Sequence, residues 1–348
     1  MNIILAPIHK NFFAGRIWMG LDYEKVATSL QVFGHTVSIV PFNELTSKPS
    51  SFFENSLLFY SSTYNKNYLQ YIKDTITFFE SVNESLVCLP NLTMLKCLEN
   101  KGFQEHVKKQ LGISNLTGRY YGDFSDFYND KDRLPFPFVF KLNHGALSKG
   151  VSLVGNIDEL KMLENKHNSR TLKDKIAQYW NKKRSFKKDD NLKPQNHLLE
   201  QNFDDVFAKR TSFVTQEFVP NLTHDFKVLL FGDRYFVLKR QTRENDFRAS
   251  GSGLFGWPKP DVSLLRYAQS LKNKFKHPFI SLDIGVDANG KHYLFELQGT
   301  GFGPISVTQA TEYYSLNNDG IEAHKNSQTL EEHYAYSIHF HAQTYLSD

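Results

Sequence analysis

The stretch FISLDIGVDANGKHYLFELQ, residues 279–298, carries the strongest structural signal in the chain. Its Asn289-Gly290 pair between two apolar-rich runs is typical of a β-hairpin with a two-residue loop. Counting outward from such a loop places Asp283 directly opposite Glu296. Because side chains alternate between the two faces of a strand, one face of this hairpin is expected to be polar and the other to face a core. The expected polar face is Ser281, Asp283, Glu296 and Gln298, and the expected core face is Leu282, Ile284, Phe295 and Leu297.

Two carboxylates that face each other across a hairpin destabilise it unless something neutralises them. Their Cβ atoms lie ~5 Å apart, and at an effective dielectric constant of ~20 their repulsion is roughly 3 kcal/mol. Magnesium prefers oxygen ligands and commonly takes one or two carboxylates together with substrate phosphates. The spacing therefore indicates a magnesium site. The alternatives are that both acids are solvated on an exposed face, that one is protonated, or that a three-residue loop shifts the register and breaks the pairing.

A second segment, FPFVFKLNHGALSKGVSLV (136–154), has the pattern of a strand, a loop of small residues and another strand. Gly145, Ser148 and Gly150 would let backbone N–H groups approach a phosphate closely, and Lys141 supplies a positive charge at the strand end. A β-hairpin with a flexible glycine tip would show the same pattern.

A third segment, VLKRQTRENDFRASGSG (237–253), is basic and ends in small residues. Its cations are Lys239, Arg240, Arg243 and Arg248. Arginines beside small residues suit an anionic oxygen that gains charge during a reaction. A basic surface loop is the alternative interpretation.

The rest of the chain divides into an alternating part and a strand-rich part. Over the first ninety residues, strands at 3–8, 36–40 and 57–62 alternate with helices at 22–33 and 68–81, a rhythm that predicts a parallel sheet with helices on its faces. A helix is expected over 92–113, and the later strands, joined by short turns, favour antiparallel pairing. Those strands are expected at 136–142, 151–154, 212–219, 226–232, 234–240 and 279–286.

A polar insertion at 156–210 interrupts the strand-rich part. The insertion contains a basic cluster at 173–190 with Tyr179 and Trp180. We interpret this cluster as a solvated helix followed by a loop, and contact with a polyanion or a membrane surface is the alternative.

The composition favours a globular, cytoplasmic protein. The 348 residues are 40% hydrophobic, which is enough for two or three domains, and no apolar run approaches the ~20 residues of a membrane span. The apolar run in MNIILAPIHK is too short for a signal peptide, and Cys88 and Cys97 have no histidines at metal-binding spacing. The formal charge of +4 is too small to require nucleic acid as a partner.

Taken together and in order, these segments resemble the ATP-grasp superfamily, in particular the branch with glutathione synthetase, D-alanine–D-alanine ligase and the ribosomal-protein glutamate ligases. The resemblance covers about residues 90–304. It implies a mixed α/β and α+β architecture in which a Rossmann-like N-terminal domain, residues 1–90, precedes two α+β subdomains that clasp the nucleotide. These subdomains are residues 91–219, with the insertion 156–210, and residues 220–348, with the metal site. It also implies that Lys101, ahead of GISNLT, and Lys141 bind phosphate, and that the backbone of the hinge Glu217-Phe218-Val219 reads the adenine edge.

Further family positions fall after residue 220. Asp225 matches an acid near the ribose, Lys227 stands where the family prefers arginine, and Lys239 joins the nucleotide-binding set. Arg240 and Arg248 match catalytic arginines that hold the phosphates and the developing acyl phosphate. The last three matches are the metal ligands Asp283, Glu296 and Gln298. Gln298 and Ser250 depart from the family, which commonly has asparagine at both positions.

The resemblance implies an ADP-forming ligase that uses ATP with Mg²⁺ or Mn²⁺ to join a small-molecule carboxylate to an amine, or to a thiol or hydroxyl. Amino acids, peptides and sugar uronates are candidate substrates. Arg16, Trp18 and the loop 299–304 are expected to border the substrate cavity, and similar ligases are commonly homodimers. Two other functions remain open: a small-molecule kinase on the same fold, and a nucleotide-binding protein without turnover.

Overall fold

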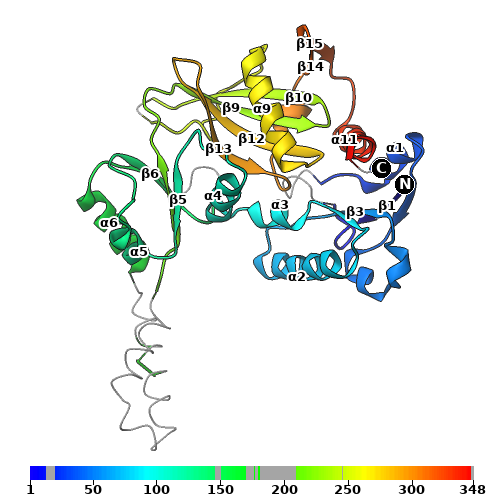
Figure 1. The fold of residues 1–348 in the computed structure, drawn as a ribbon, viewed down its shortest axis with the longest axis horizontal. Helices are drawn as coiled ribbons and strands as arrows, with labels where there is room; N and C mark the ends of the chain where they lie inside the picture. Colours follow the sequence, from blue (N-terminus) through cyan, green and yellow to red (C-terminus); the bar gives the residue numbers. More distant parts are fainter. Residues whose placement is uncertain are drawn as a thin grey trace, which may run out of the picture. The chain divides into compact units, whose positions relative to one another are not determined.

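The computed structural model describes residues 1–12, 20–145, 150–169, 176, 179–180, 209–244 and 246–345 (Figure 1). Contacts within the chain divide it into two compact units. The first contains Met1–Leu116, His144–Lys149 and Val219–Asp348, and the second contains Thr117–Asn143 and Gly150–Phe218. Arg16, Trp18, Ser148 and most of the basic segment 173–190 lie outside the described residues.

The first unit opens with a parallel sheet in the order β2-β1-β3-β4, as the alternating pattern of the first ninety residues predicts. Its helices begin where side chains cap them: Asp22 Oδ1 accepts the backbone N–H groups of Glu24 and Lys25 at 3.1 and 3.2 Å, and Asn65 caps α2 in the same way. The elements are β1 (Asn2–Ala6), α1 (Tyr23–Val32), β2 (Thr36–Ile39), η1 (Phe42–Ser47), η2 (Ser50–Phe52), β3 (Ser56–Tyr60), α2 (Lys66–Val82) and β4 (Val87–Leu89).

The second sheet of this unit is antiparallel, in the order β13-β12-β9-β10-β14-β15, with β11 paired to β10. The predicted strands at 226–232, 234–240 and 279–286 are confirmed. The structure also contains a hairpin, β14 and β15, that the sequence analysis does not predict. The strands are β9 (His224–Phe231), β10 (Arg234–Gln241), β11 (Phe255–Gly256), β12 (Phe279–Val286), β13 (His292–Gln298), β14 (Glu312–Asn317) and β15 (Gly320–Lys325). The helices are α9 (Val262–Phe275), α10 (Ile305–Thr308) and α11 (Leu330–Tyr345).

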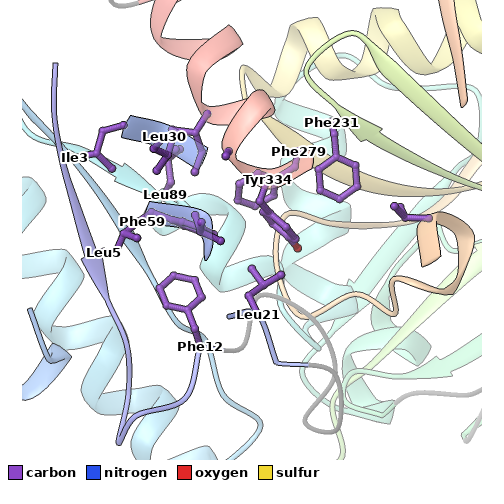
Figure 2. Packing of buried hydrophobic residues seen from close by; sticks show 14 of the residues in the cluster. Ile3, Leu5, Phe12, Leu21, Leu30, Phe59, Leu89, Phe231, Phe279 and Tyr334 are labelled. Carbon is purple, nitrogen blue, oxygen red and sulfur yellow. The ribbon is translucent and has the colours of Figure 1, made fainter. Parts of the chain in front are cut away.

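Alternation along these strands gives each face of the antiparallel sheet its own core. On one face, Phe231 and Phe279 pack with Tyr334 of α11, and Tyr334 in turn stacks on Phe59 of the parallel sheet with 5.8 Å between ring centroids (Figure 2). On the other face, residues such as Leu282 pack with α9 and with side chains of α3 and α4. The two sheets of the first unit therefore share a hydrophobic core.

This shared core is the reason that the contacts group the chain differently from the three consecutive parts expected from the sequence. Residues 1–90 and 220–348 were assigned to separate parts, yet both belong to the first unit. Helix α11 packs on α1, and Ile3, Leu5 and Phe231 belong to the same buried cluster. Patterns along a sequence do not reveal which distant segments bury their apolar faces together.

The helix expected over residues 92–113 is in fact two helices, α3 (Leu92–Cys97) and α4 (Lys101–Gln110). Glu99 has a φ of 49°, which an α-helix does not allow. Asn100 then begins α4 by accepting the backbone N–H of Phe103 at 3.0 Å. The break places Lys101 at the first position of a new helix.

The second unit is an antiparallel sheet in the order β5-β8-β6-β7, built on an aromatic core that includes Phe124, Phe138 and Phe213. Its elements are β5 (Gly118–Tyr121), α5 (Phe124–Asn129), β6 (Phe138–Leu142), β7 (Val151–Val154), α6 (Ile157–Asn168) and β8 (Phe213–Glu217). Among the described residues of both units, no helix has the length and apolar composition to cross a membrane.

Candidate functional site

The hairpin of β12 and β13 pairs Asp283 with Glu296, as the sequence predicts. The loop is longer than predicted, because Val286 rather than Asp287 pairs with His292. This difference shifts the register by one residue, and a β-bulge between Asp283 and Ile284 shifts it back. The predicted carboxylate pair is confirmed, but the two-residue loop from which it was derived is wrong.

The bulge also moves Phe295 away from the core face that the two-residue loop assigns to it. Phe295 is the extra residue of the bulge and is only partly buried. A Cβ atom at position 285 would lie 2.4 Å from its ring, so a larger residue there would displace the Phe295 side chain. Since Gly285 shares a face with Asp283, Phe295 lies on the polar face. Leu282, Ile284 and Leu297 fill the core face as predicted.

Asp283 lies in a buried network of charges formed with the neighbouring strands. Arg240 on β10 donates to both carboxylate oxygens of Asp225, at 2.7 and 2.8 Å, and lies 2.9 Å from Asp283 Oδ2. Lys227 on β9 reaches Asp283 Oδ1 at 3.4 Å and donates to Ser281 Oγ at 2.7 Å. The repulsion inferred between Asp283 and Glu296 is therefore reduced by two cations from the protein itself.

The network sets the pKa values of its members. Burial would raise the pKa of Asp283, but the charges of Arg240 and Lys227 outweigh it and hold the pKa at about 2. Burial raises the pKa of Asp225, and Arg240 offsets part of that rise. The two carboxylates also keep the pKa of Arg240 above its ordinary value, despite the opposing effect of burial. Arg240 and Asp283 are therefore both ionised at neutral pH.

Helix α4 contacts the same hairpin through Gln104, whose side chain is 1% exposed. Gln104 Oε1 accepts the backbone N–H of Leu297 at 3.2 Å, and its Nε2 donates to the carbonyl of Cys97 at 2.9 Å. β13 is the edge strand of its sheet, so this side chain takes the place of a neighbouring strand. The bond holds the backbone between Glu296 and Gln298.

Lys101 begins the same helix and is also buried. Its ammonium donates to the carbonyl of Gly145 at 2.5 Å. Lys101 and Gly145, which are both expected to bind phosphate, are therefore in direct contact within the first unit. The sequence motifs predict neither the hydrogen bond between Gln104 and Leu297 nor the one between Lys227 and Ser281. The alternation in Asp225-x-Lys227 places both side chains on one face of β9, whereas no signal in the sequence indicates Gln104.

Arg248, expected to be catalytic, is held by the acid two residues before it. Its Nε and Nη2 lie 2.9 and 2.8 Å from Asp246 oxygens, and Arg243 Nη1 lies 3.3 Å from the same carboxylate. The hydrogen bond from Arg248 is the main cause that lowers the pKa of Asp246 to about 2. The two basic residues of this loop are therefore arranged around a single ionised carboxylate.

Lys239 lies apart from the charge network. It is adjacent to Arg240 on β10, and adjacent residues of a strand point to opposite faces. Arg240 pairs with Asp225 on the polar face, so Lys239 points to the face that packs on α9. This placement does not support the nucleotide-binding role expected for Lys239.

In the second unit, Lys141 Nζ donates to Gln216 Oε1 at 2.6 Å, and the Glu217 backbone N–H donates to the carbonyl of Thr117 at 2.8 Å. Gly150 has a φ of 74°, and a Cβ there would lie 2.6 Å from Leu142, so the position requires glycine. The chain passes from the second unit to the first between Phe218 and Val219, inside the proposed adenine hinge.

The side chains of Asp283, Glu296 and Gln298 suit a magnesium ion in chemistry, since all three offer oxygen. The side chains of Glu296 and Gln298 make no hydrogen bond with another described residue, and both residues are partly exposed. Within the described ranges, no cluster of three or more His, Cys, Asp or Glu side chains is placed to hold an ion. The residues therefore fit a metal that completes its coordination with phosphate and water.

No protein-family profile matches the sequence, and no curated protein matches it. Solved structures match over nearly the whole chain. D-cycloserine synthetase DcsG is 12% identical, with a TM-score of 0.51, over 97% of this chain and 98% of that protein. A RimK-domain ATP-grasp protein from Sphaerobacter thermophilus is 8% identical, with a TM-score of 0.50, over 98% of this chain and 99% of that one.

N5-carboxyaminoimidazole synthetase from Staphylococcus aureus, in complex with ADP, is 10% identical with a TM-score of 0.52. It matches 98% of this chain and 77% of its own. The chain therefore has the ATP-grasp fold, and the predicted mixed architecture is confirmed.

Proposed function

We propose that the protein is an ATP-dependent ligase that activates a carboxylate as an acyl phosphate and transfers the acyl group to an amine. The observation that carries the proposal is the charge network on the polar face of β9, β10, β12 and β13, on a fold shared with ATP-grasp proteins. In the reaction, a substrate carboxylate oxygen attacks the γ-phosphorus and ADP leaves. The amine then attacks the acyl carbon, loses a proton and releases phosphate.

The chain's own residues supply positioning and charge. We assign Arg240 to the transferring phosphoryl group, with Asp225 holding its guanidinium by two hydrogen bonds. The ribose contact expected for Asp225 remains a prediction. Both oxygens of Asp225 accept hydrogen bonds from Arg240, so the ribose hydroxyl would have to share one of them. Asp283, Glu296 and Gln298 would hold magnesium, which when bound offsets negative charge on the phosphate oxygens.

For the nucleotide we retain Lys101 and Gly145 in the first unit, and Lys141 and Gly150 in the second, as phosphate-binding positions. Glu217, Phe218 and Val219 remain the proposed adenine hinge. The Glu217 N–H is already bonded to Thr117, so its carbonyl is the group we assign to the adenine amine. Arg248 is assigned to the acyl phosphate.

The contacts of the loop that follows Gln298 support a substrate-binding site in the first unit. Thr300 Oγ1 donates to Ser62 Oγ at 2.9 Å, and the Tyr64 hydroxyl donates to the carbonyl of Gly301. Ser62 and Tyr64 follow β3, whose carboxyl end lies beside that of β1 where the strand order of the parallel sheet reverses. Open α/β sheets bind small molecules at such points. We therefore infer that the loop 299–304 borders the substrate, in the class of amino acids, peptides or sugar uronates.

The proposal is tested with carboxylates labelled with ¹⁸O, screened in the presence of amino-acid amines. A ligase that forms an acyl phosphate transfers one ¹⁸O atom from the carboxylate to the released phosphate and forms ADP only with a suitable acid. Phosphate that stays on a hydroxyl acceptor would instead identify a kinase. Nucleotide binding without ADP release across the screen would identify a protein without turnover, and the departures from the family at Gln298 and Ser250 would then account for the loss of activity.

A further inference from the structure

Both oxygens of Asp283 are occupied by cations of the protein. Arg240 Nη2 lies 2.9 Å from Oδ2, and Lys227 Nζ lies 3.4 Å from Oδ1. The Asp283 side chain is 15% exposed, so water replaces little of this neutralisation. A metal ion that bound Asp283 would therefore have to displace a protein cation or share the carboxylate with it.

The two cations differ in how firmly they are held. Arg240 is fixed by its two hydrogen bonds with Asp225, and its side chain is 7% exposed. Lys227 has a shorter contact with the Ser281 hydroxyl, at 2.7 Å, than with Asp283, at 3.4 Å. Lys227 can therefore leave Asp283 while keeping a hydrogen-bond partner, and it is the member of the pair that can be displaced.

The protein's own cations leave little negative charge to attract a free divalent ion at this place. Three carboxylates (Asp225, Asp283 and Glu296) and two cations (Arg240 and Lys227) leave a net charge of −1, and adding a divalent ion makes it +1. Of these three carboxylates, Glu296 alone has no cation contact with a described residue. Magnesium takes about six oxygen ligands, more than these residues offer, whereas a polyphosphate brings both oxygens and negative charge.

We propose that Lys227 makes metal binding at Asp283 conditional on a bound nucleotide. In the nucleotide-free protein, Lys227 occupies the carboxylate and free divalent ions are rejected. When polyphosphate is present, Lys227 keeps Ser281, turns toward the phosphate oxygens and releases Asp283 to the metal. This inference rests on the proposed function, because it requires the nucleotide site.

The experiment titrates the full-length protein with Mn²⁺ and measures protein-bound metal by water-proton relaxation, with and without ADP. The wild-type protein is expected to bind Mn²⁺ at least a hundredfold more tightly with ADP than without it. Lys227→Met should tighten nucleotide-free Mn²⁺ binding at least tenfold. Lys227→Arg, which keeps the charge, should stay as weak as wild type. Lys239→Met is the matched control, because that lysine is on the next strand but on the opposite face, and it should change nothing.

The same nucleotide-free Mn²⁺ affinity in the wild-type protein and in Lys227→Met would overturn the inference. So would equal gains in Lys227→Met and Lys239→Met, since these would be a general effect of lost positive charge. Calorimetry with ADP alone tests the underlying function separately. If ADP binds but leaves the Mn²⁺ affinity unchanged, the inference alone fails. If no adenine nucleotide binds, the proposed function fails. Far-ultraviolet circular dichroism of each variant shows whether it is folded. If Lys227→Met does not fold, equal Mn²⁺ affinities of the wild-type protein with and without ADP would still overturn the inference.

Discussion

At the scale of single residues, the two carboxylates of the hairpin are not equivalent. Asp283 and Glu296 are cross-strand partners, and their spacing in the sequence treats them alike. In the structure Asp283 has two cationic partners, whereas Glu296 has no ion pair among the described residues. Asp283 therefore contributes to stability as well as to the proposed metal site, and Glu296 is free to serve the metal site alone.

This asymmetry predicts different effects of neutral substitutions. Asp283→Asn should lower the metal-free free energy of unfolding by on the order of 2 kcal/mol, because Arg240 and Lys227 lose a buried counter-charge. Glu296→Gln should leave it unchanged within about 0.5 kcal/mol or raise it slightly. Both substitutions should lower metal-dependent ADP release by orders of magnitude. Urea unfolding without metal and ADP-release assays measure the two effects.

A Glu296→Gln protein with wild-type turnover would remove Glu296 from the metal site. A large loss of stability in that variant would show that Glu296 has a structural partner, and the assignment would fail on that ground too.

At the scale of elements, helix α4 carries two parts of the proposed site. Lys101 at its start contacts Gly145, and Gln104, one turn later, holds the edge strand β13 by its backbone. A short helix that is capped by Asn100 and packed through Val107 presents both side chains from one rigid support. Gln104 is therefore a positioning residue for Glu296 and Gln298.

Replacing Gln104 should change the metal requirement as well as the stability. Gln104→Met leaves the buried Leu297 N–H without its acceptor, at a cost of about 1–3 kcal/mol, whereas the Cys97 carbonyl keeps the Asn100 N–H as a donor. It should also raise the Mg²⁺ concentration for half-maximal ADP release at least fivefold. Gln104→Glu, as a neutral acid, keeps an acceptor for Leu297 and a donor for Cys97, and should recover most of the metal affinity. Equal loss of stability in both variants with an unchanged Mg²⁺ requirement would leave Gln104 a purely structural role.

At the scale of the whole molecule, helix α11 packs on the core that the two sheets of the first unit share. Several histidines are buried on this helix or next to it. Burial lowers the pKa values of His277 and His333 to about 3 and that of His341 to about 4, with Arg234 adding to the effect at His333 and Lys272 at His341. These side chains are neutral in the fold and bind protons readily only when it opens.

The folded protein should therefore lose stability as the pH falls below 6.5. In that range the unfolded chain binds more protons than the native one, so the free energy of unfolding decreases with decreasing pH. Each histidine contributes roughly 1.4 kcal/mol per pH unit between about pH 6 and pH 5, where the carboxyl groups of the unfolded chain remain ionised. Urea unfolding at several pH values measures the slope, and His341→Gln should reduce it by about one proton. A slope that is flat from pH 7 to pH 5 would contradict the burial of all three side chains.

The sequence alone determined the features that depend on neighbours along the chain. Period-two alternation and turn residues predicted the strands, the pairing of Asp283 with Glu296 and the polar face that they share. The order of the motifs indicated the ATP-grasp fold. Local rules were least accurate where one residue changes the outcome, as in the hairpin loop, the position of Phe295 and the break at Glu99.

Only the tertiary structure decided how Asp283 is neutralised, what holds the edge of β13, and why the two ends of the chain belong to one unit. Arg240 and Lys227 lie more than forty residues before Asp283 along the chain, and Gln104 lies 193 residues from Leu297. These partners meet because apolar faces of separate strands and helices are buried together, as Phe59 is with Tyr334. Hydrophobic burial does not depend on how far apart two segments lie in the sequence, so only the folded structure shows which segments pack together.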